Sequence, residues 1–170
     1  SYAGLQEEIL VRTYMISLED TLRAAGHDVV IMSGFPYSAR HRRAKDLRAD
    51  VYLACHINAT PEGAPLDKAR AALLGYDHRS VGGRRLSQIV AAELGHLKHA
   101  DAKPIATEPG NWSAGMYNLI SGVFDGTPIG LTLEPLFIDQ VSDEVWRTPT
   151  GLSQIGQAIA RGVILQLAEL

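Results

Sequence analysis

The sequence predicts a single α/β domain whose mostly parallel, twisted sheet is flanked by helices. Two observations lead to this fold class. Amphipathic helical segments alternate with short, continuously apolar segments, and such apolar segments are typical of strands buried in parallel sheets. The 170 residues are 46% hydrophobic and 21% charged, which is enough for one substantial core. No internal repeat, low-complexity segment or linker interrupts the chain, so we expect one domain over residues 1–170.

The expected helices are segments in which apolar residues recur every three to four positions. The first of them ends before Gly26, a residue that suits a C-terminal cap. The second is rich in basic residues over positions 40–48, which we interpret as a solvated helix face rather than a phosphate or nucleic-acid site. The expected helices cover residues 6–25, 39–48, 81–97, 142–147 and about 151–168.

The expected strands are short apolar segments bounded by turn residues. Residues 98–114 contain two prolines and show weak periodicity, so we expect a long loop there, of the kind that often borders a substrate cleft. Trp112 and Tyr117 border this loop, where an aromatic ring either stacks on a sugar or packs in the core or in a lid. The expected strands cover residues 27–32, 49–59, 69–76, 117–123 and 129–134.

Charge and cysteine content limit the classes of function. A net charge of −3 and a pI near 6.0 argue against general nucleic-acid binding, which usually uses a basic surface. The single cysteine, Cys55, excludes an intrachain disulfide, and we interpret it as a small buried hydrophobe rather than a nucleophile. We expect no membrane span, because no segment is long and apolar enough, and we recognise no signal peptide.

Two of the expected strands deliver reactive side chains to their C-terminal ends. The strand over 49–59 presents His56 and then Asn58, and the strand over 129–134 ends in Glu134. In α/β sheets, ligands bind at the carboxyl ends of strands. Neutral imidazole is a common zinc ligand, and a carboxylate among apolar neighbours is suited to proton transfer. The pattern therefore predicts a metal-assisted hydrolase.

Zinc in a catalytic site takes about three protein ligands and keeps one position open for water. We expect the partner of His56 at the start of the first helix, where Glu7 and Glu8 flank the inward face about equally. Periodicity does not choose between these two acids. Both also complement the positive end of the helix dipole, which is a purely structural role.

Together these segments resemble the zinc-dependent N-acetylmuramoyl-L-alanine amidases of the type 3 family, which includes bacterial autolysins and phage endolysins. The resemblance rests on residues 4–7, which open a helix, on residues 47–59 around Cys55-His56-Ile57-Asn58-Ala59, and on residues 133–139 around Glu134. The order of elements matches from residue 4 to the last helix. Each motif is short, but the ordered set is fairly specific.

The resemblance implies a phosphorylase/hydrolase-like sheet, a Zn²⁺ cofactor and specific roles for site residues. Glu7 and His56 match zinc ligands, Glu134 matches the catalytic glutamate, and Asn58 matches a residue that shapes the site. We also expect His78 and Trp112 to bind substrate. The family begins with a strand that ends in a further histidine ligand, so the resemblance predicts such a strand upstream of Ser1; alternatively, His78 completes the site, or the metal site is defective.

The function implied is hydrolysis of the amide between N-acetylmuramic acid and L-alanine in peptidoglycan, in the bacterial cell wall. The partner is then the muropeptide substrate, without nucleic acid. Two alternatives stay open: a non-enzymatic cell-wall-binding or structural relative with an incomplete metal site, and another zinc amidohydrolase or carboxypeptidase. The sequence leaves open a phage or bacterial origin, the stem-peptide preference, a wall-binding domain and the oligomeric state.

Overall fold

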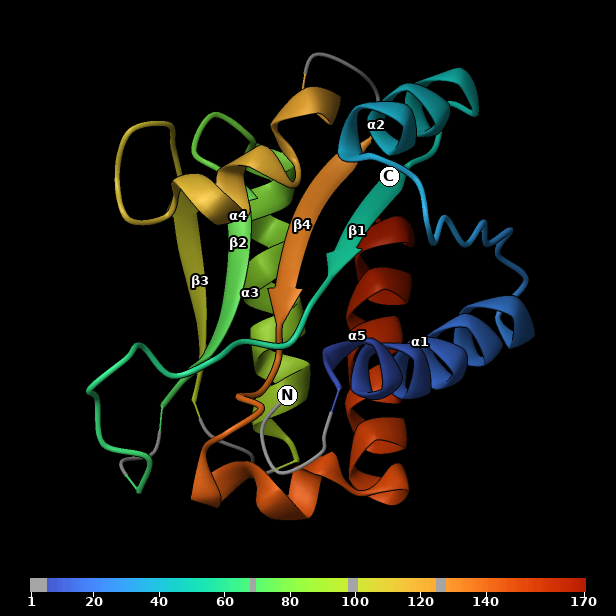
Figure 1. The fold of residues 1–170 in the computed structure, drawn as a ribbon. Helices are drawn as coiled ribbons and strands as arrows, with labels where there is room; N and C mark the ends of the chain where they lie inside the picture. The colour runs from blue at the N-terminus through green and yellow to red at the C-terminus, as the bar shows by residue number, and fades with distance from the viewer. Residues whose placement is uncertain (1–5, 68–69, 98–100, 125–127) are drawn as a thin grey trace.

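A computed structural model of the chain describes residues 6–67, 70–97, 101–124 and 128–170. Within these residues, four strands form one sheet in the order β1-β4-β2-β3. Helices α3 and α5 lie behind this sheet, α2 and α4 lie in front of it, and α1 packs on α5 (Figure 1). We call these two sides the back face and the front face. The strands are β1 (Val51–Cys55), β2 (Ala72–Asp77), β3 (Ala102–Thr107) and β4 (Ile129–Glu134); the helices are α1 (Glu7–Ala24), α2 (Tyr37–Asp46), α3 (Val81–Gly95), α4 (Ala114–Asn118) and α5 (Pro149–Leu167), with 3₁₀ helices η2 (Ser121–Val123) and η3 (Val141–Arg147).

The direction of each strand determines which loops meet. β1 is parallel to β4 and β2 is parallel to β3, whereas β2 and β4 are antiparallel. Two of the three pairings are thus parallel, which confirms the expected mostly parallel sheet. Because the central pairing is antiparallel, β1 and β4 end at one end of the sheet and β2 and β3 end at the other. We call these the β1/β4 end and the β2/β3 end.

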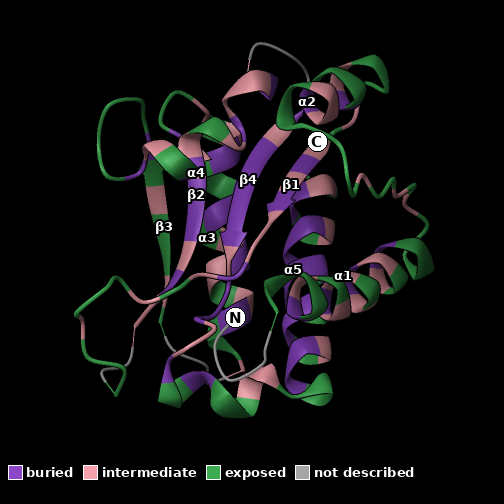
Figure 2. Ribbon diagram, in the orientation of Figure 1, coloured by how far each residue is buried: buried purple, intermediate pink, exposed green. Residues whose placement is uncertain are grey.

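The larger core lies on the back face. It joins β2 and β4 to α1, α3 and α5 through fully buried side chains such as Leu74, Leu133 and Ile159. Figure 2 shows the buried stripe of α5 and the buried length of β4 that meet there. Helix α1 approaches α5 very closely at Gly156, where a Cβ would overlap the carbonyl oxygen of Tyr14. Glycine at 156 is therefore required by the packing of these two helices.

The expected strand over residues 27–32 is wrong. The chain has no regular structure there, and Val30 and Ile31 are 53% and 42% exposed. Both residues are β-branched and favour extended backbone. A strand also needs a hydrogen-bonding partner, however, and none pairs with this segment among the described residues.

Two further expectations are corrected around α4. Residues 117–123 are helical rather than a strand, and the buried Met116, Ile120 and Val123 follow a spacing of four and three. Residues 98–114 include β3 as well as a loop, while residues 98–100 lie outside the described part of the chain. The other expected elements are present with ends shifted by a few residues, and none of the described helices is long and apolar enough to cross a membrane.

Candidate active site

His56 and Glu134 meet at the β1/β4 end of the sheet. Cys55 pairs in register with Leu133, so the next residues, His56 and Glu134, are level with each other. The backbone N–H of His56 donates to the carbonyl of Leu133 at 2.9 Å, which continues the ladder by one bond. The structure therefore brings together the imidazole and the carboxylate that the strand-end pattern singled out.

Both side chains belong to the front face of the sheet. On β1, Tyr52 and Ala54 pack on the front face against Ala44 of α2, Ile120 and Val123. Alternation along the strand places His56 on the same face. On β4, the hydroxyl of Thr132 donates to the carbonyl of Met116 in α4 at 3.0 Å, which places Glu134 on that face too. Helices α2 and α4 cover the opposite half of this face in Figure 1, toward the β2/β3 end.

Glu7 reaches this site from the first turn of α1. Its Oε1 lies 3.2 Å from Nδ1 of His56 and accepts a hydrogen bond from the backbone N–H of Ile57, also at 3.2 Å. Of the two acids between which periodicity does not choose, Glu7 is the one that contacts His56. One carboxylate thus fixes both the ring and the backbone at the end of β1.

Glu134 has an unusual electrostatic environment. Burial, and secondly the negative charge of Glu7, raise the pKa of the Glu134 carboxyl from 4.5 to about 7. Within the described residues no hydrogen-bond donor or cation is paired with this carboxylate. A carboxyl group with a pKa near neutrality can both accept and donate a proton at physiological pH, as a general base that later acts as an acid must do.

The loops that follow β1 and β4 are tied to each other. Asn58 bridges to Phe137, and its backbone exchanges hydrogen bonds with Leu136 and Ile138 at 3.0 and 2.9 Å. The side chain of Asn58 is used locally, because its Oδ1 accepts from the N–H of Ala59 at 2.8 Å. The resulting bridge shapes the rim of the site beside His56 and Glu134.

A buried tyrosine on α1 holds the backbone of His56 by a hydrogen bond. Tyr14 on α1 is fully buried and its hydroxyl donates to the carbonyl of His56 at 3.3 Å. The same hydroxyl is hydrogen-bonded with the thiol of Cys55, and burial raises the pKa of that thiol to about 11. Cys55 is therefore protonated at neutral pH, consistent with its interpretation as a packing residue rather than a nucleophile.

Sequence reasoning missed Tyr14 as well as Tyr37, whose ring centroid lies 6.5 Å from that of His56. A signal existed for Tyr14. The buried face of α1 runs through Leu10, Tyr14, Leu18 and Leu22, and Tyr14 brings a polar hydroxyl into an otherwise apolar stripe. Buried tyrosine hydroxyls usually have a partner. No comparable signal marked Tyr37, because its place beside His56 depends on the packing of α2.

The donor set fits zinc in chemistry but supplies only part of a site. The separation of 3.2 Å between Glu7 Oε1 and His56 Nδ1 is what two ligands of one tetrahedral zinc have when each lies about 2.0–2.1 Å from the ion. Among the described residues, however, no group of three histidine, cysteine, aspartate or glutamate side chains is arranged to hold a metal. Glu7 and His56 are thus two candidate ligands.

His78 and Trp112 lie away from this site, which corrects the expectation that they line it. Both follow strands that end at the β2/β3 end, because β2 runs antiparallel to β4. Nδ1 of His78 bonds to the carbonyl of Thr107 at 3.1 Å, and Trp112 is 73% exposed in the loop after β3. His78 therefore does not complete a metal site with His56.

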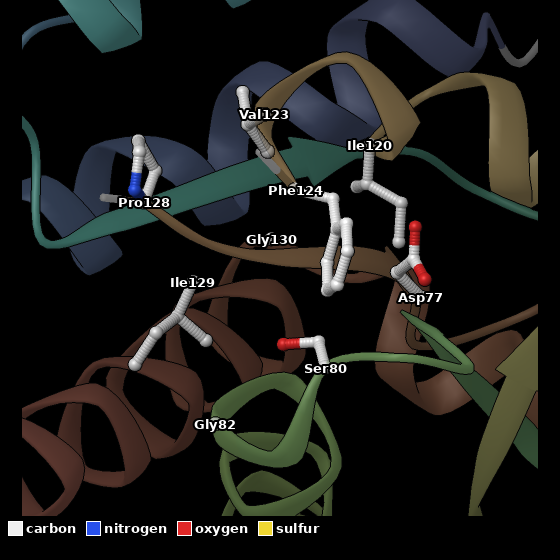
Figure 3. Close-up of a pocket in the computed structure, with 9 residues that line it drawn as sticks. All are labelled: Asp77, Ser80, Gly82, Ile120, Val123, Phe124, Pro128, Ile129 and Gly130. Atoms are coloured by element: carbon white, nitrogen blue, oxygen red, sulfur yellow. The ribbon is translucent and has the colours of Figure 1, made fainter. Parts of the chain in front are cut away.

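The cavity in Figure 3 also belongs to the β2/β3 end. It has a volume of about 120 Å³. Its polar side chains are those of Asp77 and Ser80, and the rest of its lining is largely apolar. Asp77 is already bonded to Arg79, and Ser80 caps α3 by accepting from the N–H of Gly83. Both polar side chains of this cavity therefore have structural roles.

No family model and no curated protein matches the sequence, but solved structures match the fold. An N-acetylmuramoyl-L-alanine amidase from Clostridium difficile 630 superposes with a TM-score of 0.75 at 19% identity, over 98% of this chain and 86% of that one. The catalytic domain of CwlV, an N-acetylmuramoyl-L-alanine amidase from Bacillus (Paenibacillus) polymyxa var. colistinus, superposes with a TM-score of 0.73 at 16% identity. The match covers 97% of this chain and 87% of that one. The fold is that of solved N-acetylmuramoyl-L-alanine amidases. Cwp6 from Clostridium difficile gives 0.75 at 16% identity over 96% of this chain, which spans 26% of the length of Cwp6.

Proposed function

We propose that this chain is a zinc-dependent N-acetylmuramoyl-L-alanine amidase that cleaves the amide between N-acetylmuramic acid and L-alanine in peptidoglycan. The observation that carries the proposal is the arrangement at the β1/β4 end. A Glu7–His56 pair with zinc-ligand spacing lies beside Glu134, whose carboxyl has a pKa of about 7. The shared fold of amidases and the motifs around these residues support the same reading.

Each residue has a definite part in this mechanism. Glu7 and His56 would hold the metal, which when bound supplies positive charge that polarises the scissile carbonyl and acidifies water. Glu134 takes a proton from the attacking water, and then gives it to the nitrogen of the leaving amine. In the metal-free protein, burial and the charge of Glu7 raise the pKa of Glu134 to about 7, so this carboxyl is suited both to take up and to release a proton near neutral pH.

The surrounding contacts keep these groups in position. Asn58 links the two loops at the rim, and Tyr14 holds the carbonyl of His56. Positioned groups of this kind contribute to rate because small displacements of reacting groups are costly. We place the activity at the bacterial cell wall, where the substrate lies.

A non-enzymatic wall-binding relative is the second candidate, and one observation favours it: the described residues provide two zinc ligands rather than three. Zinc content distinguishes the two. The amidase proposal expects about one zinc per chain after purification in the presence of zinc, whereas protein that retains no zinc after supplementation supports the binding module.

The activity itself is tested with purified sacculi. We expect zinc-loaded protein to release new amino termini, with L-alanine as the exposed residue in mass spectra of the products. A panel of muropeptides and simple N-acyl amino acids identifies the amide that is cleaved. Cleavage of N-acyl amino acids without any cleavage of muropeptides would instead assign the protein to another class of zinc amidohydrolase.

A further inference from the structure

A row of four residues crosses the sheet at the level of the candidate site. The strand register places His56 level with Glu134, Glu134 opposite Leu73 on β2, and Leu73 level with Lys103 on β3. Neighbouring strands lie about 4.8 Å apart, so the backbone of Lys103 is about 10 Å from that of Glu134. The row thus extends the site sideways over β2 and β3.

The side chain of Lys103 shares the front face with Glu134. A Cβ at Gly75 would meet side-chain atoms of Met116 in α4 and of Thr107, which places Gly75 and Thr107 on the front face. Lys103 lies four residues before Thr107 in the same strand, so alternation gives it the same face. Ala102, its neighbour, packs against the back core as alternation requires, and Lys103 itself is exposed.

The side chains at the two sides of this region differ in charge. Glu7 and Glu134 lie on the β1 and β4 side, while the exposed Lys103 lies on the β3 side. An exposed ammonium group about 10 Å from the backbone of Glu134 is thus available to an anionic group of a bound ligand.

Lys103 orients an extended ligand, because its positive charge attracts a negative group of that ligand toward the β3 side of the site. The aromatic ring of Tyr37 lies on the His56 side instead, where an uncharged sugar can pack against it. Because one extended residue spans about 3.3–3.6 Å, a carboxylate two or three residues beyond the cleaved amide reaches the level of Lys103.

We propose that Lys103 binds a free carboxylate on the peptide part of the substrate, two or three residues beyond the cleaved amide. The protein then prefers acidic stem peptides over those in which that carboxylate is amidated. This inference rests on the proposed amidase function, since it assigns the direction in which the peptide leaves Glu134.

The test uses two synthetic muramoyl peptides that differ only in whether the side-chain carboxylate of the second residue is free or amidated. We expect kcat/KM of the wild-type protein to be about fivefold higher for the free acid, mainly through KM, because one exposed charge pair contributes up to about this factor. Lys103→Ala removes the preference, and Lys103→Arg retains it. High salt reduces the preference in the wild type.

Arg84→Ala is the matched control. Arg84 is exposed on α3, behind the sheet, so this variant loses the same charge and keeps the wild-type preference. If the wild type cleaves both peptides equally well, or Lys103→Ala keeps the preference, the inference is overturned while the amidase proposal stands. If the wild type cleaves neither peptide, the proposed function fails, and equilibrium binding of the two peptides tests the carboxylate site instead. Tighter binding of the acidic peptide supports the site if Lys103→Ala abolishes this difference. Equal binding of the two peptides overturns it.

Discussion

Each end of the sheet has an acid and a histidine at its strand ends, but the pKa of the acid is shifted in opposite directions at the two ends. At the β2/β3 end, Asp77 accepts from Nε and Nη2 of Arg79 at 2.9 and 2.7 Å. Burial acts to raise the pKa of Asp77, but the hydrogen bonds and charge of Arg79 outweigh it and hold that pKa below the usual value. At the β1/β4 end, burial and the charge of Glu7 raise the pKa of Glu134 to about 7.

The difference shows that an acid and a histidine at strand ends do not by themselves make a site. Asp77 is closed into a fork with Arg79, and the guanidinium of Arg79 also lies 4.0 Å over the ring of Phe124. That arrangement is a satisfied structural pair. Glu134 lies instead beside a second carboxylate, an arrangement that costs stability and is typical of functional sites.

The largest expected effect separates the two acids. Glu134→Gln removes the proposed proton carrier, so we expect the rate of amide cleavage to fall by about 10³-fold or more while the fold is kept. Asp77→Asn, the matched change at the other end, leaves kcat near that of the wild type and lowers the free energy of unfolding by about 2 kcal/mol through its weakened bonds to Arg79. Cleavage assays and urea unfolding of both variants measure this contrast, and equal activities of the two variants would contradict it.

The two histidines provide the next comparison. His56→Ala removes a proposed zinc ligand, and we expect zinc affinity to fall by at least about 100-fold in competition with a chelator. His78 lies at the other end of the sheet, so His78→Ala leaves zinc affinity unchanged. A similar loss of affinity in both variants would place the metal elsewhere.

Tyr14→Phe tests the support below His56. Loss of the hydroxyl that donates to the His56 carbonyl should reduce turnover about tenfold and lower the free energy of unfolding by about 1 kcal/mol. Tyr52→Phe is the control. Tyr52, on β1, is buried like Tyr14, but its ring packs edge-on against His41 rather than supporting His56. We expect turnover of Tyr52→Phe to stay within about twofold of the wild type.

The smallest expected effect is a pH dependence of stability in the metal-free protein. Because folding raises the pKa of Glu134 from 4.5 to about 7, the folded state binds the Glu134 proton more tightly than the unfolded state does. The contribution of this proton to the free energy of unfolding is therefore present below pH 4.5 and is lost as pH rises to about 7. Glu134→Gln removes this loss, so its Tm should exceed that of the wild type by a few degrees at pH 8, roughly, and by less at pH 5. An NMR titration of the Glu134 carboxyl reports its pKa directly, and a value near 4.5 would contradict the expectation.

Strand ends were predictable from the sequence because the signal is local. The apolar segments before His56 and Glu134 are continuous, and parallel pairing of their strands brings the two residues level. Glu7 was not predictable from periodicity, since its contact with His56 depends on how α1 packs on α5. Only the resemblance to amidases favoured Glu7 over Glu8.

The errors arose where structure depends on partners distant in sequence. Residues 27–32 have the propensity of a strand but no partner strand among the described residues. The segment 117–123 is short and apolar, and such segments are ambiguous between helix and strand. The antiparallel β2–β4 pairing, which moves His78 and Trp112 to the other end, is a long-range property that no local pattern reports.

The glycine at position 156 has a consequence for the chemistry. Glu7 belongs to a helix that rests on α5, whereas His56 and Glu134 belong to the sheet. The close contact that Gly156 allows between α5 and α1 therefore sets the distance between Glu7 on α1 and His56 at the end of β1. A single added methyl group there would shift α1 as a unit and move Glu7, the proposed zinc ligand, relative to His56, although α5 itself contributes no residue to the proposed site.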